Sequence, residues 1–122
     1  MGTHEIRLRG GWECAVPGDS ESVSARLALP VRVDDLPAGR VRLTRWFHRP
    51  PRFGGGPVVL RLRRAPGIRS IVLNGRTIGP ISPGLPDWEV ELGMLARRNE
   101  LVIEAEPAGR IPVWGEISLI FR

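Results

Sequence analysis

Apolar and polar residues alternate along most of this chain with a period of two. In residues 41–48 the two sides of the alternation are Val41, Leu43, Arg45 and Phe47 against Arg42, Thr44, Trp46 and His48. Strict alternation predicts a β-strand with one face in the core and the other in solvent. Similar patterns predict strands over residues 6–9, 22–29, 41–48, 58–63, 71–73, 76–79, 88–92, 101–106 and 116–121. Short strands in this number, about eight, separated by turn residues, are typical of an all-β jelly-roll sandwich. A helical turn is expected at most over residues 92–98.

The dipeptide Asn74-Gly75 predicts a β-hairpin. Ile71-Val72-Leu73 precedes it, and Arg76-Thr77-Ile78 follows at once. Asn and Gly tolerate the positive φ angles of a two-residue type I′ turn, and the twist of that turn matches the twist of the flanking strands. We therefore expect a tight turn at residues 74–75 between two antiparallel strands.

The length of 122 residues is enough for one domain with one hydrophobic core, so we expect residues 1–122 to fold as a single unit. Charged residues make up 25% of the chain and apolar residues 42%, which are ordinary values for a globular protein. No apolar run reaches the ~18 residues that cross a bilayer. The first residues carry no apolar segment of a secretory signal, so the predicted location is the cytoplasm and no membrane partner is expected.

Few residues of this chain could hold a metal. Cys14 is the only cysteine, which excludes an internal disulfide, and His4 and His48 are far apart in the sequence. A zinc site is therefore not expected. The loop carboxylates Asp34-Asp35 and Asp19-Ser20-Glu21 leave calcium as a minor alternative to having no cofactor, because neither loop has the spacing of a dedicated calcium site.

The basic residues favour a solvated strand surface. All 18 of them are arginines, the net charge is +5, and they are spread along the strands instead of forming a basic tail. Later strands carry outward glutamates, and opposite charges on neighbouring strands each contribute about 0.2–1 kcal/mol. Nucleic-acid binding usually shows a clustered basic footprint, so it is the less favoured interpretation. If these arginines pair with the glutamates, their charge is neutralised and nucleic-acid binding is no longer expected.

Several segments, taken in order, resemble the sugar-binding domain of glycoside hydrolase family 2. They are Leu29-Pro30, residues 44–50, residues 58–62, residues 71–79, residues 88–92 and residues 98–104. The best-preserved marks are the Asn74-Gly75 hairpin and the Asn99-Glu100-Leu101 start of a strand. The resemblance implies a jelly roll of the galactose-binding-domain-like type, which in that family precedes a catalytic barrel.

The resemblance implies a non-catalytic carbohydrate-binding or accessory module. Residues 1–122 leave no room for a catalytic barrel, and no pair of catalytic glutamates can be carried over to them. The stretch before Phe47 has Leu43 and Thr44 where the family carries aromatic residues, and residues 80–87 lack the histidine that the family shows there. We therefore expect no enzymatic activity. The alternative is a structural or protein-interaction domain, with a protein partner or a second copy of the chain as its partner.

Trp46 is the first candidate for ligand contact. By alternation it faces away from Phe47, and an exposed indole beside polar groups suits stacking on the C–H face of a sugar ring. The alternative is that a neighbouring loop covers it. His48 and Arg49 at the strand end could add polar contacts.

Asp87 and Trp12 are further candidates with clear alternatives. Asp87 lies in the Pro-rich loop and could contact a hydroxyl group or only stabilise a turn. Trp12 follows Gly10-Gly11, where a bulge could reverse its face. Trp88 and Trp114 are expected in the core or at its rim. Arg45 faces inward and needs a carboxylate or backbone carbonyls as a partner. Cys14 has no nearby histidine that would make it a nucleophile.

Overall fold

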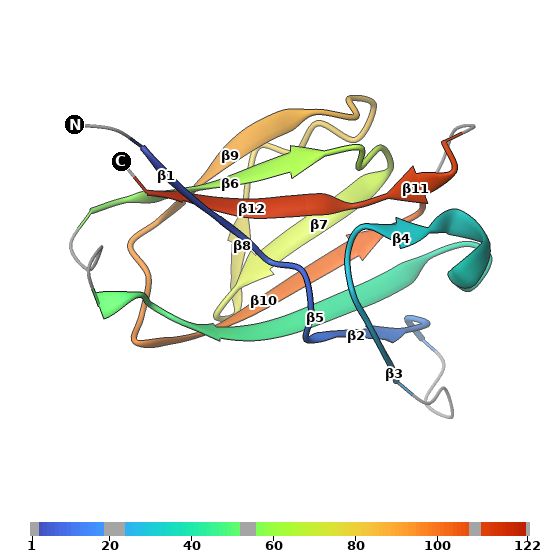
Figure 1. Cartoon of the computed structure of the whole chain (residues 1–122), viewed down its shortest axis with the longest axis horizontal. Coiled ribbons are helices and arrows are strands. Elements are labelled where there is room, and N and C mark those ends of the chain that lie inside the picture. The colour runs from blue at the N-terminus through green and yellow to red at the C-terminus, as the bar shows by residue number, and fades with distance from the viewer. Residues whose placement is uncertain (1–2, 19–23, 52–55, 108–110, 122) are drawn as a thin grey trace.

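The chain folds into a β-sandwich (Figure 1). The computed structural model describes residues 3–18, 24–51, 56–107 and 111–121. Within them the strands are β1 (His4–Arg7), β2 (Trp12–Ala15), β3 (Ala25–Leu27), β4 (Val31–Arg32), β5 (Val41–His48), β6 (Val58–Arg63), β7 (Ile68–Leu73), β8 (Arg76–Ile78), β9 (Trp88–Gly93), β10 (Arg98–Ala105), β11 (Val113–Trp114) and β12 (Glu116–Phe121). A short 3₁₀ turn, η1 (Val33–Asp35), follows β4. The described part of the chain contains no helix with the length and hydrophobicity needed to span a bilayer.

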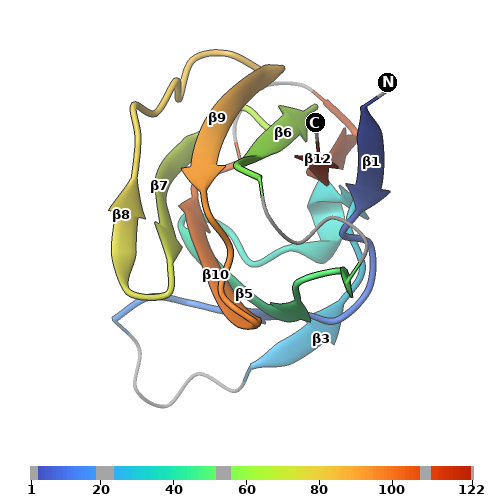
Figure 2. The ribbon, with the colours of Figure 1, turned by 90° about the vertical axis from the view of Figure 1, so that its left-hand side faces the viewer.

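Two antiparallel sheets form the layers of the sandwich. The four-stranded sheet has the order β1-β12-β6-β9, and the six-stranded sheet has the order β3-β2-β5-β10-β7-β8. The end-on view in Figure 2 shows the first set of strands curving over the second. Strands β11 and β4 form a separate two-stranded pair. Apart from the consecutive pairs β2–β3 and β7–β8, neighbouring strands in the two sheets come from distant parts of the sequence, as in a jelly roll, and the all-β prediction is confirmed.

The core lies between the inner faces of the two sheets, as the alternation predicts. In β5, Val41, Leu43 and Phe47 are buried, and in β10 Leu101 and Ile103 are buried. The core is completed by the inner residues of the four-stranded sheet, among them Val58, Leu60, Leu62, Val90, Leu92, Ile117, Leu119 and Phe121. Fully burying one such side chain contributes about 1.5–3 kcal/mol, so this core is the main favourable contribution to the stability of the sandwich.

The predicted hairpin is present, and its turn is bonded to β10. Asn74 and Gly75 have φ angles of 53° and 79°, and Leu73 pairs with Arg76 across the turn. The Asn74 backbone N–H donates to the Glu100 carbonyl (2.9 Å), and the Glu100 N–H donates back to Asn74 Oδ1 (2.8 Å). Asn74 Nδ2 donates to Asn99 Oδ1 (3.1 Å). The two best-preserved sequence marks therefore form one hydrogen-bonded unit.

Asn99 is the centre of this unit and is fully buried. Its Oδ1 also accepts from the Ala96 N–H (2.9 Å), while its Nδ2 donates to the carbonyls of Ala96 (3.0 Å) and Phe47 (3.5 Å). Buried amides are stable only when their polar atoms are paired, and here both ends of the amide are paired. Asn99 thus fixes the start of β10 against the end of β5.

The structure departs from the predicted elements in several places, and strands β2, β4 and β11 lie outside the predicted ranges. The helical turn expected over residues 92–98 is wrong, because β9 runs to Gly93, β10 starts at Arg98, and Asn99 bonds both backbone groups of Ala96. Gly11, with φ of 80°, separates β1 from β2. The strand expected over 22–29 is described only as Ala25–Leu27, and residues 22–23 lie outside the described residues.

Candidate functional site

Trp46 is exposed on the outer face of the six-stranded sheet. Its position in β5 alternates with the buried Phe47, and half of its surface (50%) is accessible to solvent. The alternative that a loop covers it is therefore wrong. β5 lies between β2 and β10 in the sheet order, but β2 pairs only with residues 42–44, so at Trp46 the strand is paired on the β10 side alone. This pairing with β10 gives the side chain a fixed base.

Residues of β10 surround Trp46 through the β5–β10 register. Glu100 pairs with Trp46 and Arg98 pairs with His48, so all four side chains share the outer face. The Arg98 guanidinium carbon lies 4.4 Å from the centre of the Trp46 ring, which is a cation–π contact. We call Trp46, His48, Arg98 and Glu100 the Trp46 surface. Arg98 and Glu100 were not among the predicted candidates, because they are brought here by the pairing of strands about fifty residues apart in the sequence.

Arg45 fixes the backbone beneath the Trp46 surface. Its Nε donates to the Gly10 carbonyl (2.7 Å) and its Nη1 donates to the Trp46 carbonyl (3.1 Å). The backbone-carbonyl partner expected from the sequence is therefore present. Partial burial lowers the pKa of Arg45 from its usual value because desolvation disfavours the charged form. Arg45 joins the β1–β2 connection to β5 and has a structural role.

The loop between β9 and β10 adds positive charge beside the Trp46 surface. The Arg49 N–H donates to the Arg97 carbonyl (2.9 Å), and Arg49 Nη1 reaches the Leu95 carbonyl (3.4 Å). Arg97 and Arg98 are consecutive, so three arginines gather at this end of the β5–β10 pair, next to His48. Of the predicted candidates, Trp46, His48 and Arg49 are brought together here.

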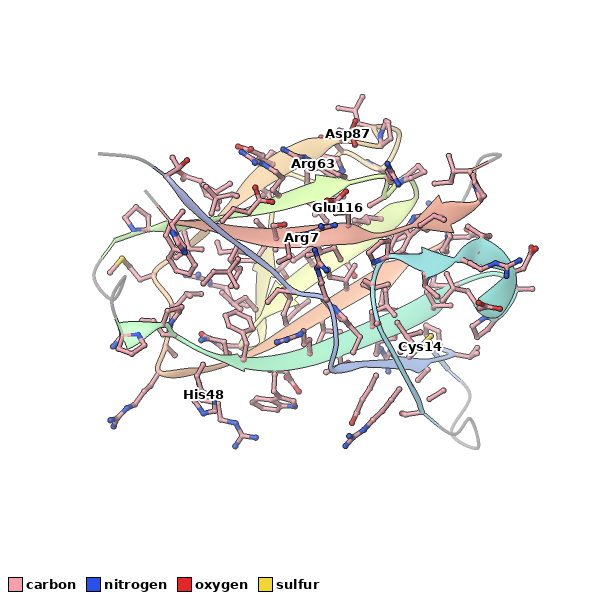
Figure 3. All side chains as sticks on the ribbon, in the orientation of Figure 1. Arg7, Cys14, His48, Arg63, Asp87 and Glu116 are labelled. Carbon is pink, nitrogen blue, oxygen red and sulfur yellow. The ribbon has the colours of Figure 1, made fainter. Side chains whose placement is uncertain are left out.

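Asp87 and Trp12 are not part of this group. In Figure 3, His48 lies below the six-stranded sheet, whereas Asp87 lies at the opposite side of the molecule. Asp87 Oδ1 accepts from the Arg64 N–H (3.0 Å), in keeping with a turn-stabilising role. Trp12 is fully buried and its Nε1 donates to the Leu8 carbonyl (2.8 Å), so ligand contact at Trp12 is a wrong prediction. The left-handed backbone at Gly11 precedes this inward turn.

Two surface hollows lie away from the Trp46 surface. A polar hollow of about 270 Å³ is lined by Asp87, Trp88, Glu89, Arg61, Leu62 and Arg63. The buried Trp88 Nε1 beside it has no hydrogen-bond partner among the described residues. A mainly apolar hollow of about 580 Å³ lies between residues 66–69 and 83–86, with Glu106 and Ile111. Hydrogen bonds of 2.9 Å from Gly67 N to the Pro83 carbonyl and from Ala65 N to the Pro86 carbonyl hold its walls.

The described residues offer no group of three metal-binding side chains. Asp34 and Asp35 form the 3₁₀ turn η1, and the other acidic loop, residues 19–21, lies outside the described residues. Cys14 is a buried free thiol, and burial raises its pKa above the usual value. A buried neutral thiol is a poor nucleophile. Trp114 is fully buried and Trp88 half-buried, as expected for core and rim residues.

Comparison with solved structures relates this arrangement to known enzymes. The β-glucuronidase of Ruminococcus gnavus superposes with a TM-score of 0.75 at 12% identity, over 98% of this chain and 29% of that chain. The β-galacturonidase of Eisenbergiella tayi, a family 2 glycoside hydrolase, gives 0.73 at 13% identity, over 98% and 24%. The β-glucuronidase of Dictyoglomus thermophilum gives 0.72 at 14%, over 97% and 28%. This chain has the fold of a glycoside hydrolase family 2 domain. No protein-family model and no curated protein sequence matches it.

This chain matches only a part of each of these enzymes. The chain spans less than a third of each of these enzyme chains, so it corresponds to one domain within each. Within this fold, residues 80–87 connect β8 to β9 on the side where Asp87 lies, away from His48. The 80–87 loop and the Trp46 surface therefore do not form a common concavity.

Proposed function

We propose that this chain is a non-catalytic carbohydrate-binding accessory module and that its Trp46 surface contacts the sugar. The proposal is supported by the family 2 fold and carried by one observation, the half-exposed indole of Trp46 on a central strand. A flat aromatic face can stack on a pyranose ring, and the Arg98 contact holds the indole in one orientation. His48, Arg98 and Glu100 supply donors and acceptors for hydroxyl groups around the ring.

The experiment is a calorimetric and fluorescence titration with a panel of oligosaccharides. We expect binding by the wild-type chain and a loss of about tenfold or more in affinity for Trp46→Ala, equivalent to about 1.4 kcal/mol. Leu85→Ala is the matched control, because Leu85 is equally exposed (52%) but lies in the 80–87 loop. Absence of binding to every oligosaccharide, or equal losses for the two variants, would contradict the proposal.

The second candidate function is a protein-interaction domain. It is favoured by the exposure of three large apolar side chains, Trp46 (50%), Leu85 (52%) and Met94 (57%), and by the longer chains in which similar domains occur. Stable interfaces bury more than about 1,000 Å² and protect such residues from solvent. Sedimentation analysis that finds a dimer, with dissociation by Trp46→Ala, would favour this function over sugar binding.

A further inference from the structure

The arginines beside Trp46 form no ion pair with the described acidic residues, in contrast to four arginines on other parts of the sheets. Arg7 pairs with Glu116 (2.6 Å), Arg61 with Glu5 (2.9 Å) and Glu89 (2.8 Å), Arg69 with Glu106 (3.0 Å), and Arg42 more loosely with Glu104 (3.9 Å). No carboxylate of the described residues forms an ion pair with Arg49, Arg97, Arg98 or His48. The positive charge at this end of β5 and β10 is therefore available to a ligand.

Glu100 is the acidic residue nearest to this group in the strand register. It lies opposite Trp46, on the side of Arg98 away from the strand end, and its backbone N–H is bonded to Asn74. Three guanidinium groups against one carboxylate leave a local excess of positive charge. Salt screens exposed charges over a Debye length of ~8 Å at physiological ionic strength, so Arg98, which contacts the indole, contributes most to the attraction of a ligand bound there.

The geometry of Arg98 suits a ligand that carries both a ring and an anion. Its guanidinium is already held 4.4 Å above the centre of the Trp46 ring, so little side-chain entropy is lost when a ligand binds. Guanidinium groups bind carboxylates and sulfates through two parallel hydrogen bonds. Because Arg98 covers the centre of one face of the Trp46 ring, a sugar would stack on the other face, and an anionic substituent that extends past the ring edge would meet the Arg98 guanidinium.

We infer that the Trp46 surface selects acidic glycans, in which sugar rings bear carboxylate or sulfate groups. This inference rests on the proposed carbohydrate-binding function and adds the chemical class of the ligand. The aromatic face supplies binding to the ring, and the unpaired arginines supply the preference for charge. A neutral oligosaccharide would use the first contribution only.

The test compares oligogalacturonate with its fully methyl-esterified form, which keeps the rings but removes the charge. We expect the acid to bind about tenfold more tightly than the ester at low salt. The advantage should shrink as the salt concentration rises from about 20 to about 200 mM, because salt screens exposed charges. A sulfated oligosaccharide forms a second arm, which shows whether carboxylate or sulfate is preferred.

Variants separate the two contributions. Arg97→Gln should reduce the preference for the acid while leaving ester binding within about twofold. Arg98→Gln should reduce the preference and also weaken ester binding, because Arg98 orients the indole, and Trp46→Ala should weaken both. Arg42→Gln is the matched control, because Arg42 lies on the same face of β5 but beside Glu104. We expect Arg42→Gln to keep the preference for the acid.

Each result has a distinct meaning. Equal binding of acid and ester would overturn this inference while leaving the proposed function intact. Absence of binding to both would overturn the proposed function and the inference with it. A single-stranded oligothymidylate is included because stacking and arginine contacts also suit single-stranded nucleic acid. If it binds more tightly than oligogalacturonate through Trp46, the acidic-glycan assignment is wrong.

Discussion

Replacing Asn99 tests the unit that joins the hairpin, the β9–β10 loop and β5. Asn99→Ala removes three hydrogen bonds of 2.9–3.1 Å, to Ala96 N–H, to the Ala96 carbonyl and to Asn74, and a longer one to Phe47. At a net ~1 kcal/mol per bond, the loss is about 3 kcal/mol. For a chain of 122 residues this lowers the melting temperature by about 12 °C.

The assay is urea denaturation followed by circular dichroism, with Thr77→Ala as the control. Thr77 is exposed on the edge strand β8, so its replacement should change the free energy of unfolding by less than about 0.5 kcal/mol. Asn99→Asp should cost about as much as Asn99→Ala, because an oxygen would replace Nδ2 opposite the Ala96 carbonyl. A loss below about 1 kcal/mol for both Asn99 variants would refute this account of the buried amide.

Three further predictions concern the frame of the sandwich. Gly75→Ala should lower the free energy of unfolding by about 1–2 kcal/mol, because φ is +79° although no atom lies within 4 Å of the new Cβ. Gly115→Ala should lower it further, because its new Cβ would also lie 3.2 Å from Leu29 Cδ2, and equal losses in thermal melts would contradict this role of packing. Arg45→Ala should lower the free energy of unfolding by about 2 kcal/mol through the lost bonds to Gly10 and Trp46, and a value near zero in urea denaturation would disagree. Burial raises the pKa of the Cys14 thiol, so the unfolded chain loses this proton at a lower pH than the folded chain, and the free energy of unfolding should decline as the pH rises above the usual thiol pKa of 9.0. Thermal melts at several pH values should show a smaller decline for Cys14→Ala, and a decline identical to that of the wild type would count against this prediction.

The period-two pattern was enough to predict most of the strands. β5, β6, β9 and β12 begin and end close to the predicted positions. In β5 and β9 buried and exposed residues alternate, whereas β12 is buried on both faces over residues 117–121. The pairs β4 and β11 were missed because two-residue strands carry no periodicity. The pattern allows at most a helical turn over residues 92–98, and it does not reveal the irregular loop found there, because the contact that stabilises the loop comes from the side chain of Asn99.

The candidate site was only partly predictable. Alternation placed Trp46 and His48 on one face, but their neighbours Arg98 and Glu100 depend on which strands pair and in what register. Long-range register is set by the whole core and by contacts such as Asn74 with Asn99, which lie 25 residues apart. The burial of Trp12 likewise follows from the conformation of Gly11, where the sequence permits either face.

The most direct test of the central claim is a nitrogen–proton NMR titration of the four tryptophan indole groups with oligogalacturonate. Trp46 is identified by the signal that disappears in Trp46→Phe, and Trp12 and Trp114 serve as internal controls because both are fully buried. The account predicts a saturable shift of the Trp46 signal with the other three nearly unchanged. A shift of the Trp88 signal alone, or no shift at any concentration, would contradict it.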